Sequence, residues 1–352
     1  MSKSLGNIID PLEIINEYGA DALRFSLIST TAQGQDVYLS KERFEQGRNF
    51  ANKIWNASRF ILMNLKPQEV GVDLCVFFKR EQLDIVNRWI LSRFYTTLDK
   101  VTKELDSFKF NEAANSLYSF FWHEFCDWYL ELIKPQIGQK QTQIVMYKVL
   151  EKTLRLLHPF MPFITEEIWQ RLPGAKNFIM QQSIPHLQKE LINRQDELQM
   201  ELAFDVINTI RNMRAELEIN PASQIKIQLA VTHKLTQKSL QLLSGYIKNL
   251  TKVNNLTITD KYIAQSNQYA VVFKDLHIVM PLEGVVDVSQ QLKKTSLKID
   301  KLKFEIKNKE TMLANKNFTA RAPGEIVEAE KNKLIDMHEQ VKKLKEIKNG
   351  LR

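Results

Sequence analysis

The chain has 352 residues, of which 44% are hydrophobic, and a formal net charge of +8 at neutral pH. That length usually forms two or three domains, and the hydrophobic fraction is enough to build their cores. No run approaches about 18 apolar residues, and the first residues lack the basic and apolar segments of a secretory signal. We therefore expect a globular, cytoplasmic protein rather than a membrane or secreted one.

The positive charge is concentrated at one end of the chain. Residues 289–352 hold 16 Lys and Arg and 9 Asp and Glu, a net charge of +7, which leaves 33 and 32, or +1, for residues 1–288. A basic segment favours a polyanionic partner such as RNA, because neutralised phosphates release their counterions. Solvated, lysine-rich helix faces are the alternative that charge alone leaves open.

The two cysteines, Cys75 and Cys126, lie among apolar or aromatic residues, without a Cys-x-x-Cys spacing or a histidine at ligand spacing. A metal site would need such spacing, and a disulfide would be unusual in a reducing cytoplasm. We predict two small hydrophobic residues and no metal site.

The N-terminal segment predicts a loop followed by two short helices. After residues 1–9, Asp10 is suited to cap a helix, Pro11 to its first position and Gly19 to its end. Asp21 is then expected to cap the second helix. That helix carries four core candidates, which are Ala22, Leu23, Phe25 and Leu27.

Apolar residues at steps of three and four predict long amphipathic helices in the next stretch. The expected ranges are 40–65, 82–105, 111–133, 142–157 and, after an interruption from His158 to Pro162, 163–172. We interpret the dense aromatic residues of the third helix as core, with a ligand site formed by Trp122, Trp128 and Tyr129 as the alternative. These helices predict a bundle.

A link follows near Pro173, and after the next helix the pattern changes period at Asn220-Pro221. A helix is expected over 198–217, a strand over 225–231, a helix over 240–250 and a hairpin over 271–282. Two helices follow, because apolar residues recur at steps of three and four over 292–313 and over 327–351. Their short connection predicts an antiparallel coiled-coil hairpin, with Thr295 and Lys309 as exceptions at the seam.

Several motifs occur in an order typical of one family. Met1-Ser2-Lys3-Ser4 resembles the K-M-S-K-S loop of class I aminoacyl-tRNA synthetases without its first lysine. It is followed by Gly6-Asn7, Asp10-Pro11 and Gly19-Ala20-Asp21-Ala22-Leu23-Arg24, in the order typical of that family. Three further segments resemble the branch that is specific for valine, isoleucine and leucine. They are Asn49 to Phe60, Cys126 to Glu131 and His158 to Glu167. Within that branch, Arg211 to Glu216 and the C-terminal hairpin most resemble the valyl members. The sequence lacks the Cys-based zinc site that is common in isoleucyl members.

The resemblance implies that valine is activated by ATP and then transferred to tRNA(Val). Met1, Ser2, Lys3 and Ser4 would form the ATP-binding loop, in which the catalytic Lys3 neutralises the β and γ phosphate oxygens together with Mg²⁺. The family's H-I-G-H segment, nucleotide-binding sheet and editing domain are not found in this sequence. We therefore expect the carboxy-terminal part of a valyl-tRNA synthetase, beginning inside the loop and unable to form valyl-adenylate by itself.

The resemblance also implies a mainly α fold in four regions. These are the end of a catalytic domain (1–35), a helical-bundle anticodon-binding domain (36–185), a connecting helix with a small α+β module (186–287) and a coiled-coil tRNA-binding arm (288–352). Eight residues are expected to contact tRNA, namely Lys53, Arg59, Arg211, Arg214, Lys293, Lys294, Lys342 and Lys343. We expect phosphate contacts and recognition of shape by a monomer.

Other functions stay open at this point. An isoleucine- or leucine-tRNA ligase would share the bundle, because the residues that select the amino acid lie outside this sequence. A non-catalytic RNA-binding protein could reuse the bundle and the arm. A structural coiled-coil protein would explain only the tail and would leave the motifs that start at Met1 unexplained.

Overall fold

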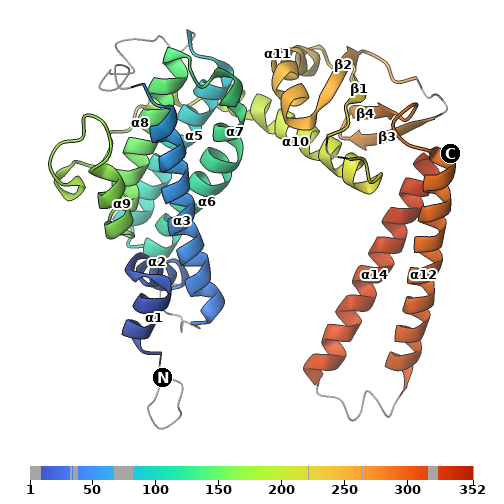
Figure 1. The fold of residues 1–352 in the computed structure, drawn as a ribbon, viewed down its shortest axis with the longest axis horizontal. Coiled ribbons are helices and arrows are strands. Elements are labelled where there is room, and N and C mark those ends of the chain that lie inside the picture. Colours follow the sequence, from blue (N-terminus) through green and yellow to red (C-terminus); the bar gives the residue numbers. More distant parts are fainter. Residues whose placement is uncertain are drawn as a thin grey trace. The chain divides into compact units, whose positions relative to one another are not determined.

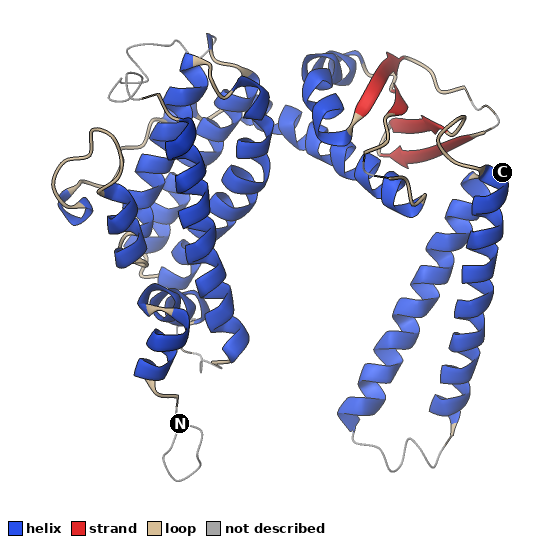
Figure 2. Ribbon diagram, in the orientation of Figure 1, coloured by secondary structure: helices blue, strands red, loops and turns tan. Residues whose placement is uncertain are grey.

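A computed structural model gives the structure of the protein. It describes residues 9–31, 34, 39–66, 82–220, 222–263, 265, 267–315 and 324–351. The chain forms two compact units, 1–200 and 201–352, and helices dominate both, with one small sheet in the second (Figures 1 and 2). The mainly α fold with a small α+β module is therefore confirmed. None of the helices in the described ranges is both long and apolar enough to cross a membrane.

Helices α1 (Pro11–Tyr18) and α2 (Ala20–Thr30) open the first unit. The Asp10 carboxylate accepts a hydrogen bond from the Leu12 N–H at 2.8 Å, so the predicted cap of α1 is confirmed. Gly19 has a φ of +95°, and its N–H donates to the Ile15 carbonyl, which ends the helix at a position where a side chain would be strained.

Asp21 was expected from the sequence to cap α2, but it caps another helix instead. Its carboxylate accepts hydrogen bonds from the backbone N–H groups of Phe163 at 3.2 Å and Ile164 at 2.6 Å, in the first turn of α9 (Pro162–Trp169). In the same motif, Arg24 donates to the Pro159 carbonyl at 3.0 Å. The expectation was wrong because a free helix N-terminus far along the chain folds next to this carboxylate.

The bundle is formed by the helices that follow α2. They are α3 (Lys41–Asn64), α5 (Ile85–Asp106), α6 (Phe110–Ser119), α7 (Leu130–Leu132), α8 (Lys140–Leu157) and α9, with short 3-10 turns at Lys134–Gln136, Ile179–Gln181 and Lys189–Leu191. The helix predicted over 111–133 contains a π-helical segment, Phe120–Tyr129, which joins α6 to α7. Such segments shift the side chains that follow them around the helix axis.

The phenylalanine and tyrosine residues of the π-helical segment belong to the core, as predicted, whereas Trp122 and Trp128 are only half-buried. Phe121, Phe125 and Tyr129 are fully buried and pack in a chain of ring contacts, with centroids 5.5 Å apart at each step. The Tyr129 hydroxyl donates to the Asn87 side-chain oxygen at 2.8 Å, so its buried polar atom is satisfied. These three rings stabilise the core of the bundle.

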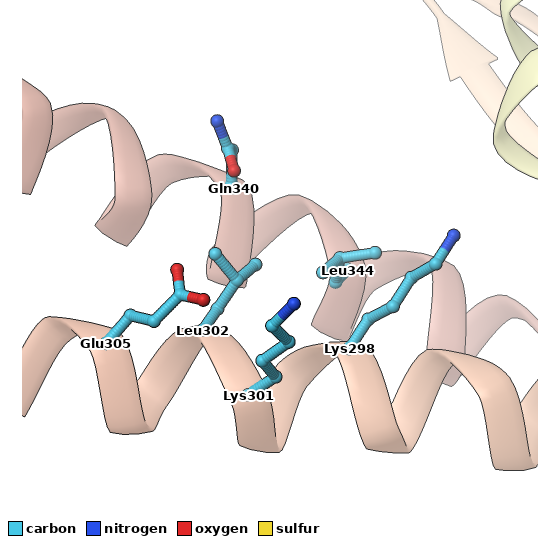
Figure 3. Close-up of a pocket in the computed structure, with 6 residues that line it drawn as sticks. All are labelled: Lys298, Lys301, Leu302, Glu305, Gln340 and Leu344. Atoms are coloured by element: carbon cyan, nitrogen blue, oxygen red, sulfur yellow. The ribbon is translucent and has the colours of Figure 1, made fainter.

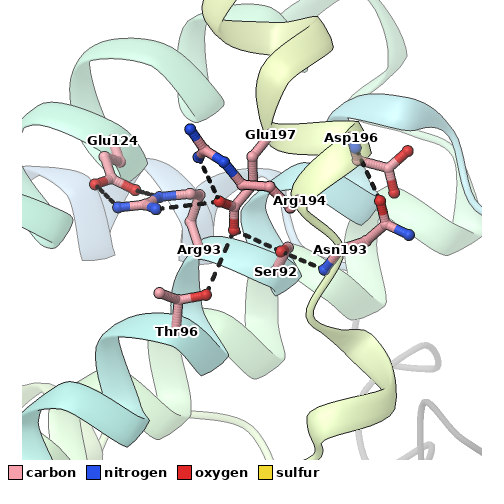
Figure 4. Close-up of polar contacts among 8 residues, drawn as sticks. All are labelled: Ser92, Arg93, Thr96, Glu124, Asn193, Arg194, Asp196 and Glu197. Atoms are coloured by element: carbon pink, nitrogen blue, oxygen red, sulfur yellow. Dashed lines mark hydrogen bonds and ion pairs between the residues drawn. The ribbon is translucent and has the colours of Figure 1, made fainter.

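An ionic network holds the start of α10 (Arg194–Glu216) against the bundle (Figure 4). The Arg93 guanidinium bonds Glu124 at 2.7 and 2.9 Å and reaches Glu197 at 3.4 Å. The Ser92 hydroxyl donates to Glu197 at 2.6 Å and accepts the Asn193 N–H at 2.8 Å. Because the Glu197 side chain is only 4% exposed, this network fixes where the helix begins.

The second unit contains a four-stranded sheet. Its elements are β1 (Ile225–Ala230), α11 (Lys234–Thr251), β2 (Val253–Thr259), β3 (Gln268–Phe273) and β4 (Leu276–Pro281), in the order β2-β1-β4-β3. The predicted hairpin is confirmed and turns at Lys274, which has a φ of +55°. Strand β2 was not predicted. It pairs with β1 in parallel after the crossover helix α11, and as an edge strand it exposes too many residues to show an alternating pattern.

Helices α12 (Val288–Ala314) and α14 (Gly324–Gly350) pair along their lengths, as the predicted hairpin requires. Ile299, Ile306 and Val341 are buried between them. Both exceptions in the seam are accommodated. Thr295 is 3% exposed, and Lys309 pairs with Glu330 across the two helices.

Candidate nucleic-acid interface

The signature residues Met1, Ser2, Lys3 and Ser4 lie outside the residues that the structure describes. Their expected role stays a prediction from the resemblance. The described structure begins with Ile9, just before the cap of α1, and places α1 and α2 against the bundle helix α3 through Ile14, Tyr18, Ala22 and Phe44. The segment that follows the signature is therefore anchored to a rigid support.

Lys53 lies on α3, and its charge is already used within the bundle. Its ammonium donates to the Asp127 carboxylate at 2.7 Å and lies 5.2 Å from the centre of the Trp122 ring. The side chain remains 31% exposed. His123 lies 3.4 Å from the same carboxylate. A phosphate would have to share Lys53 with Asp127.

A shallow groove of about 200 Å³ adjoins Lys53. It is lined by Lys53, Asn56, Ala57, Phe60, Cys126, Leu130, Glu131 and Lys134. Burial raises the pKa of the Cys126 thiol to about 12, so this cysteine is an unreactive small hydrophobe, as predicted. The groove offers an apolar floor with polar side chains at its rim, which suits the edge of an unpaired base better than a metal or a reaction.

Arg59 lies on the same helix as Lys53 but differs from it in pairing. Its side chain is exposed, and within the described ranges it has no hydrogen-bond or ion-pair partner. An exposed guanidinium can bind a phosphate with two parallel hydrogen bonds without giving up an internal contact. Among the expected contacts on the bundle, Arg59 is therefore the better placed for RNA.

Arg211 and Arg214 follow each other on α10 and have different surroundings. Arg211 is exposed and donates to the Leu250 carbonyl at 3.3 Å. Arg214 is 7% exposed, and its guanidinium donates to the carbonyls of Thr251, Asn220 and Ser223 at 3.3, 2.8 and 2.7 Å. This geometry favours a structural role for Arg214 over the RNA contact expected from the sequence, and leaves Arg211 as the accessible member.

The four expected lysines of the arm have different environments. Lys293 and Lys342 are exposed on α12 and α14, and the side chain of Lys343 lies outside the described residues. Lys294 is 3.6 Å from the Glu218 carboxylate, which also pairs with Lys298. The hydrogen bond and charge of Lys298 lower the pKa of Glu218. The base of the arm is therefore tied to the end of α10 by an exposed ionic cluster.

Two cations that the sequence prediction missed, Lys298 and Lys301, lie along a groove of about 420 Å³ between the arm helices (Figure 3). The groove is lined by Lys298, Lys301, Leu302, Glu305, Gln340 and Leu344. The signal was present in the sequence, because Lys294, Lys298 and Lys301 follow at steps of four and three and must share one face of a helix. The cations of α12 thus form a stripe beside an apolar seam.

Metal-ligating side chains do not cluster anywhere in the described parts of the chain, where no group of three His, Cys, Asp or Glu residues could hold an ion. Cys126 is free and buried. The chemistry that the described surfaces offer is the binding of anions by lysine and arginine, beside small apolar grooves.

Three family models match the chain in order. Residues 1–40 match tRNA synthetases class I (I, L, M and V), residues 87–229 match the anticodon-binding domain of tRNA ligase, and residues 287–352 match the valyl tRNA synthetase tRNA binding arm. The last match covers the helix pair, and the second runs from α5 of the bundle through α10 to β1 of the sheet.

Individual relatives match nearly the whole chain. A valine–tRNA ligase of Syntrophotalea carbinolica is 41% identical over 98% of the chain, and one of Thermotoga maritima is 39% identical over all of it. The chain spans 39% of the length of each. A solved LeuRS-tRNA-LeuAMS complex of Agrobacterium radiobacter K84 is 24% identical, with a TM-score of 0.45, over 55% of this chain and 23% of that one.

Proposed function

Because this chain belongs to the valine–tRNA ligase family of class I synthetases, we propose that it recognises tRNA(Val) for an enzyme that activates valine with ATP and transfers it to that tRNA. The observation that carries the proposal is the arm, a paired-helix hairpin with exposed cations that matches the tRNA-binding arm of valyl synthetases. Such a surface binds the phosphates of an RNA and recognises its shape, without reading its base sequence.

The recognition surfaces divide between the two units. In the first, Arg59 and Lys53 contact the RNA beside the small groove on α3. In the second, Arg211, Lys293, Lys294, Lys342 and Lys343 contribute, together with Lys298 and Lys301. Arg214 supports this surface by holding the end of α10. Region 1–35 carries the signature loop, and region 36–185 binds the anticodon stem. Region 186–287 connects that domain to the arm, and region 288–352 binds the outer corner of the tRNA.

The catalytic contribution of this chain is its signature loop. In the full enzyme, Lys3 would place a positive charge on the β and γ phosphate oxygens of ATP, Ser2 and Ser4 would donate hydrogen bonds, and a bound Mg²⁺ would supply further neutralisation of those oxygens. That contribution counts where the contacts tighten as pyrophosphate departs. The enzyme acts as a monomer in the cytoplasm, a compartment in keeping with the free, buried Cys126.

The test is a binding titration of the purified chain with tRNA(Val), tRNA(Ile) and an unrelated tRNA over a salt series. We expect tighter binding of tRNA(Val) and an affinity that falls steeply with salt. Replacing the exposed Lys293 and Lys342 by Gln should flatten the salt dependence by about one unit of slope for each lost phosphate contact. Absence of tRNA binding at low salt would refute the proposal.

Isoleucine or leucine specificity is the alternative within the same reaction. A preference for tRNA(Ile) in the same titration would change the proposed amino-acid specificity from valine to isoleucine, with the same recognition surfaces. Exchange of ATP and pyrophosphate is measured in parallel with valine, isoleucine and leucine. We expect no exchange by this chain, and valine-dependent exchange would show that its own residues suffice for activation.

A further inference from the structure

A polar pocket lies on the first unit, away from the groove beside Lys53. Helices α5 and α8 form its floor, and the segment from Ser183 to Leu191 forms its wall. Its volume is about 340 Å³, which is within the range of pockets that hold small ligands. None of the residues expected from the sequence to bind tRNA lines it.

The wall of this pocket is held in place by the residues of its floor. The Arg155 guanidinium on α8 donates to the Ser183 carbonyl at 3.0 Å. At the other end of the wall, the Tyr95 hydroxyl donates to the Gln188 side-chain oxygen at 2.5 Å and accepts from the Lys152 ammonium at 2.6 Å. The pocket is therefore preformed, and a ligand would not have to order the wall before binding.

The charge of the pocket is positive. Lys148, Lys152 and Arg155 follow at steps of four and three on one face of α8, against a single lining carboxylate, Glu151, which lies 3.1 Å from Arg155. In the described ranges Lys148 has no hydrogen-bond or ion-pair partner, and its ammonium lies 5.9 Å from the centre of the Tyr147 ring. The charge of Lys148 is thus not matched by an acid in the described residues, which favours an anionic ligand.

The pocket also has apolar lining residues. Ile184 is 58% exposed and is followed by the buried Pro185, and Leu91, Phe94, Val149 and Leu191 complete this lining. The pocket therefore combines an exposed isoleucine and ammonium groups in one lining. A ligand that fits both must combine a phosphate with a flat, largely apolar group.

We propose that this pocket binds one nucleotide unit, with its phosphate at Lys148 and Lys152 and its base against Ile184 and Pro185. The unit is either a free nucleoside monophosphate or an unpaired residue of an RNA. Only the second source rests on the proposed function, because a free nucleotide would fill the pocket whether or not the chain recognises tRNA.

The experiment titrates the full chain with AMP, GMP, CMP and UMP by calorimetry at low salt, and with tRNA(Val) in parallel. The variants are Lys148→Met and Lys152→Met, and Lys140→Met is the control, since Lys140 lies on α8 but does not line the pocket. We expect nucleotide binding that weakens at least about tenfold in each pocket variant, the usual cost of one charge-assisted hydrogen bond. The control should bind as the unaltered chain does.

The two sources are separated by competition. A monophosphate that weakens tRNA binding identifies the site as one for an RNA residue, as does loss of tRNA affinity in Lys148→Met when no free nucleotide binds. Nucleotide binding without competition identifies a free nucleotide as the ligand.

Saturable binding of no nucleotide, together with unchanged tRNA affinity in both pocket variants, overturns the inference while leaving the proposed function intact. Equal nucleotide affinity in Lys148→Met and the unaltered chain overturns it as well. Lys148→Met decides the matter if Lys152→Met unfolds, because Lys152 also supports Tyr95 and the wall whereas Lys148 does not.

Discussion

The ionic network at the start of α10 and the arm both contain several cations but use them in opposite ways. In the network, Arg93 is 27% exposed and is paired with Glu124 and Glu197 (Figure 4). Arg88 is 20% exposed and is paired with Asp196. Along the arm, Lys293, Lys301 and Lys342 are exposed. The comparison teaches that pairing and burial, rather than the number of positive charges, separate residues that hold the fold from residues available to a polyanion.

The largest effect on stability is expected in the ionic network at the start of α10. Glu197→Ala leaves Arg93 short of one partner and Ser92 without its acceptor, and should lower the free energy of unfolding of the first unit by about 3 kcal/mol. All five tryptophans lie in the first unit, so a shift of the urea transition followed by tryptophan fluorescence measures it. Glu167→Ala, at an exposed pair with Arg171, is the control and should leave that transition unchanged.

The same carboxylate predicts a pH dependence. Burial alone would raise the pKa of Glu197, but the hydrogen bond from Ser92 and the charges of Arg93 and Arg194 lower the pKa below its usual value. A lowered pKa contributes stability that is present above the unfolded pKa, about 4.3, and is lost as pH falls through the folded pKa. The deficit of Glu197→Gln should therefore be largest at neutral pH and shrink in acid. A deficit that grows in acid would contradict the network.

Arg214 and Arg59 test the comparison in the other direction. Arg214→Ala removes the donor to three carbonyls and should lower the free energy of unfolding of the second unit by about 2 kcal/mol, without a change in the salt slope of tRNA binding. Far-UV circular dichroism should record the shift, while tryptophan fluorescence should not. Arg59→Ala should do the reverse, with stability unchanged and the slope reduced by about one. If both variants behave alike, burial does not separate the two roles.

A smaller effect is expected at Asp21. Asp21→Ala removes the acceptor for two N–H groups at the start of α9 and should cost about 1 kcal/mol, measured by tryptophan fluorescence in urea. Asp21→Asn keeps one oxygen acceptor and should cost less. Asp99→Ala, at a helix-surface pair with Lys103, is the matched control. Equal stability of Asp21→Ala and this control would show that the cap contributes nothing.

Asp21 also shows what could be predicted from the sequence and what could not. Asp10 and Gly19 were predicted correctly because each acts on residues within a few positions. The partner of Asp21 lies 142 residues away, and no periodicity links the two positions. The helices of the bundle and the arm were predictable for the same reason as Asp10, since an apolar stripe is a local signal, whereas the edge strand β2 gave none.

The candidate site was predictable only as far as residue type. Lysine and arginine at family-like positions were expected to contact RNA, yet Arg214 is buried among carbonyls and Lys53 is paired with Asp127. Whether a cation faces solvent depends on neighbours that folding brings from other elements. The stripe of Lys294, Lys298 and Lys301 was readable from helical spacing and is the part of the site that the sequence could have supplied.

The smallest expected effect is at Glu218, where the arm meets the end of α10. Its exposed carboxylate pairs with Lys294 and Lys298, so it competes with phosphates for the same two ammonium groups. Glu218→Gln should leave stability unchanged, because exposed ion pairs contribute little, and should tighten tRNA binding by about twofold at low salt and not at high salt. Glu339→Gln changes the net charge of the chain equally without touching these lysines and is the control. Equal tightening by both variants would mean that only the overall charge of the arm matters, whereas a gain confined to Glu218→Gln would show that local pairing sets which cations the RNA can use.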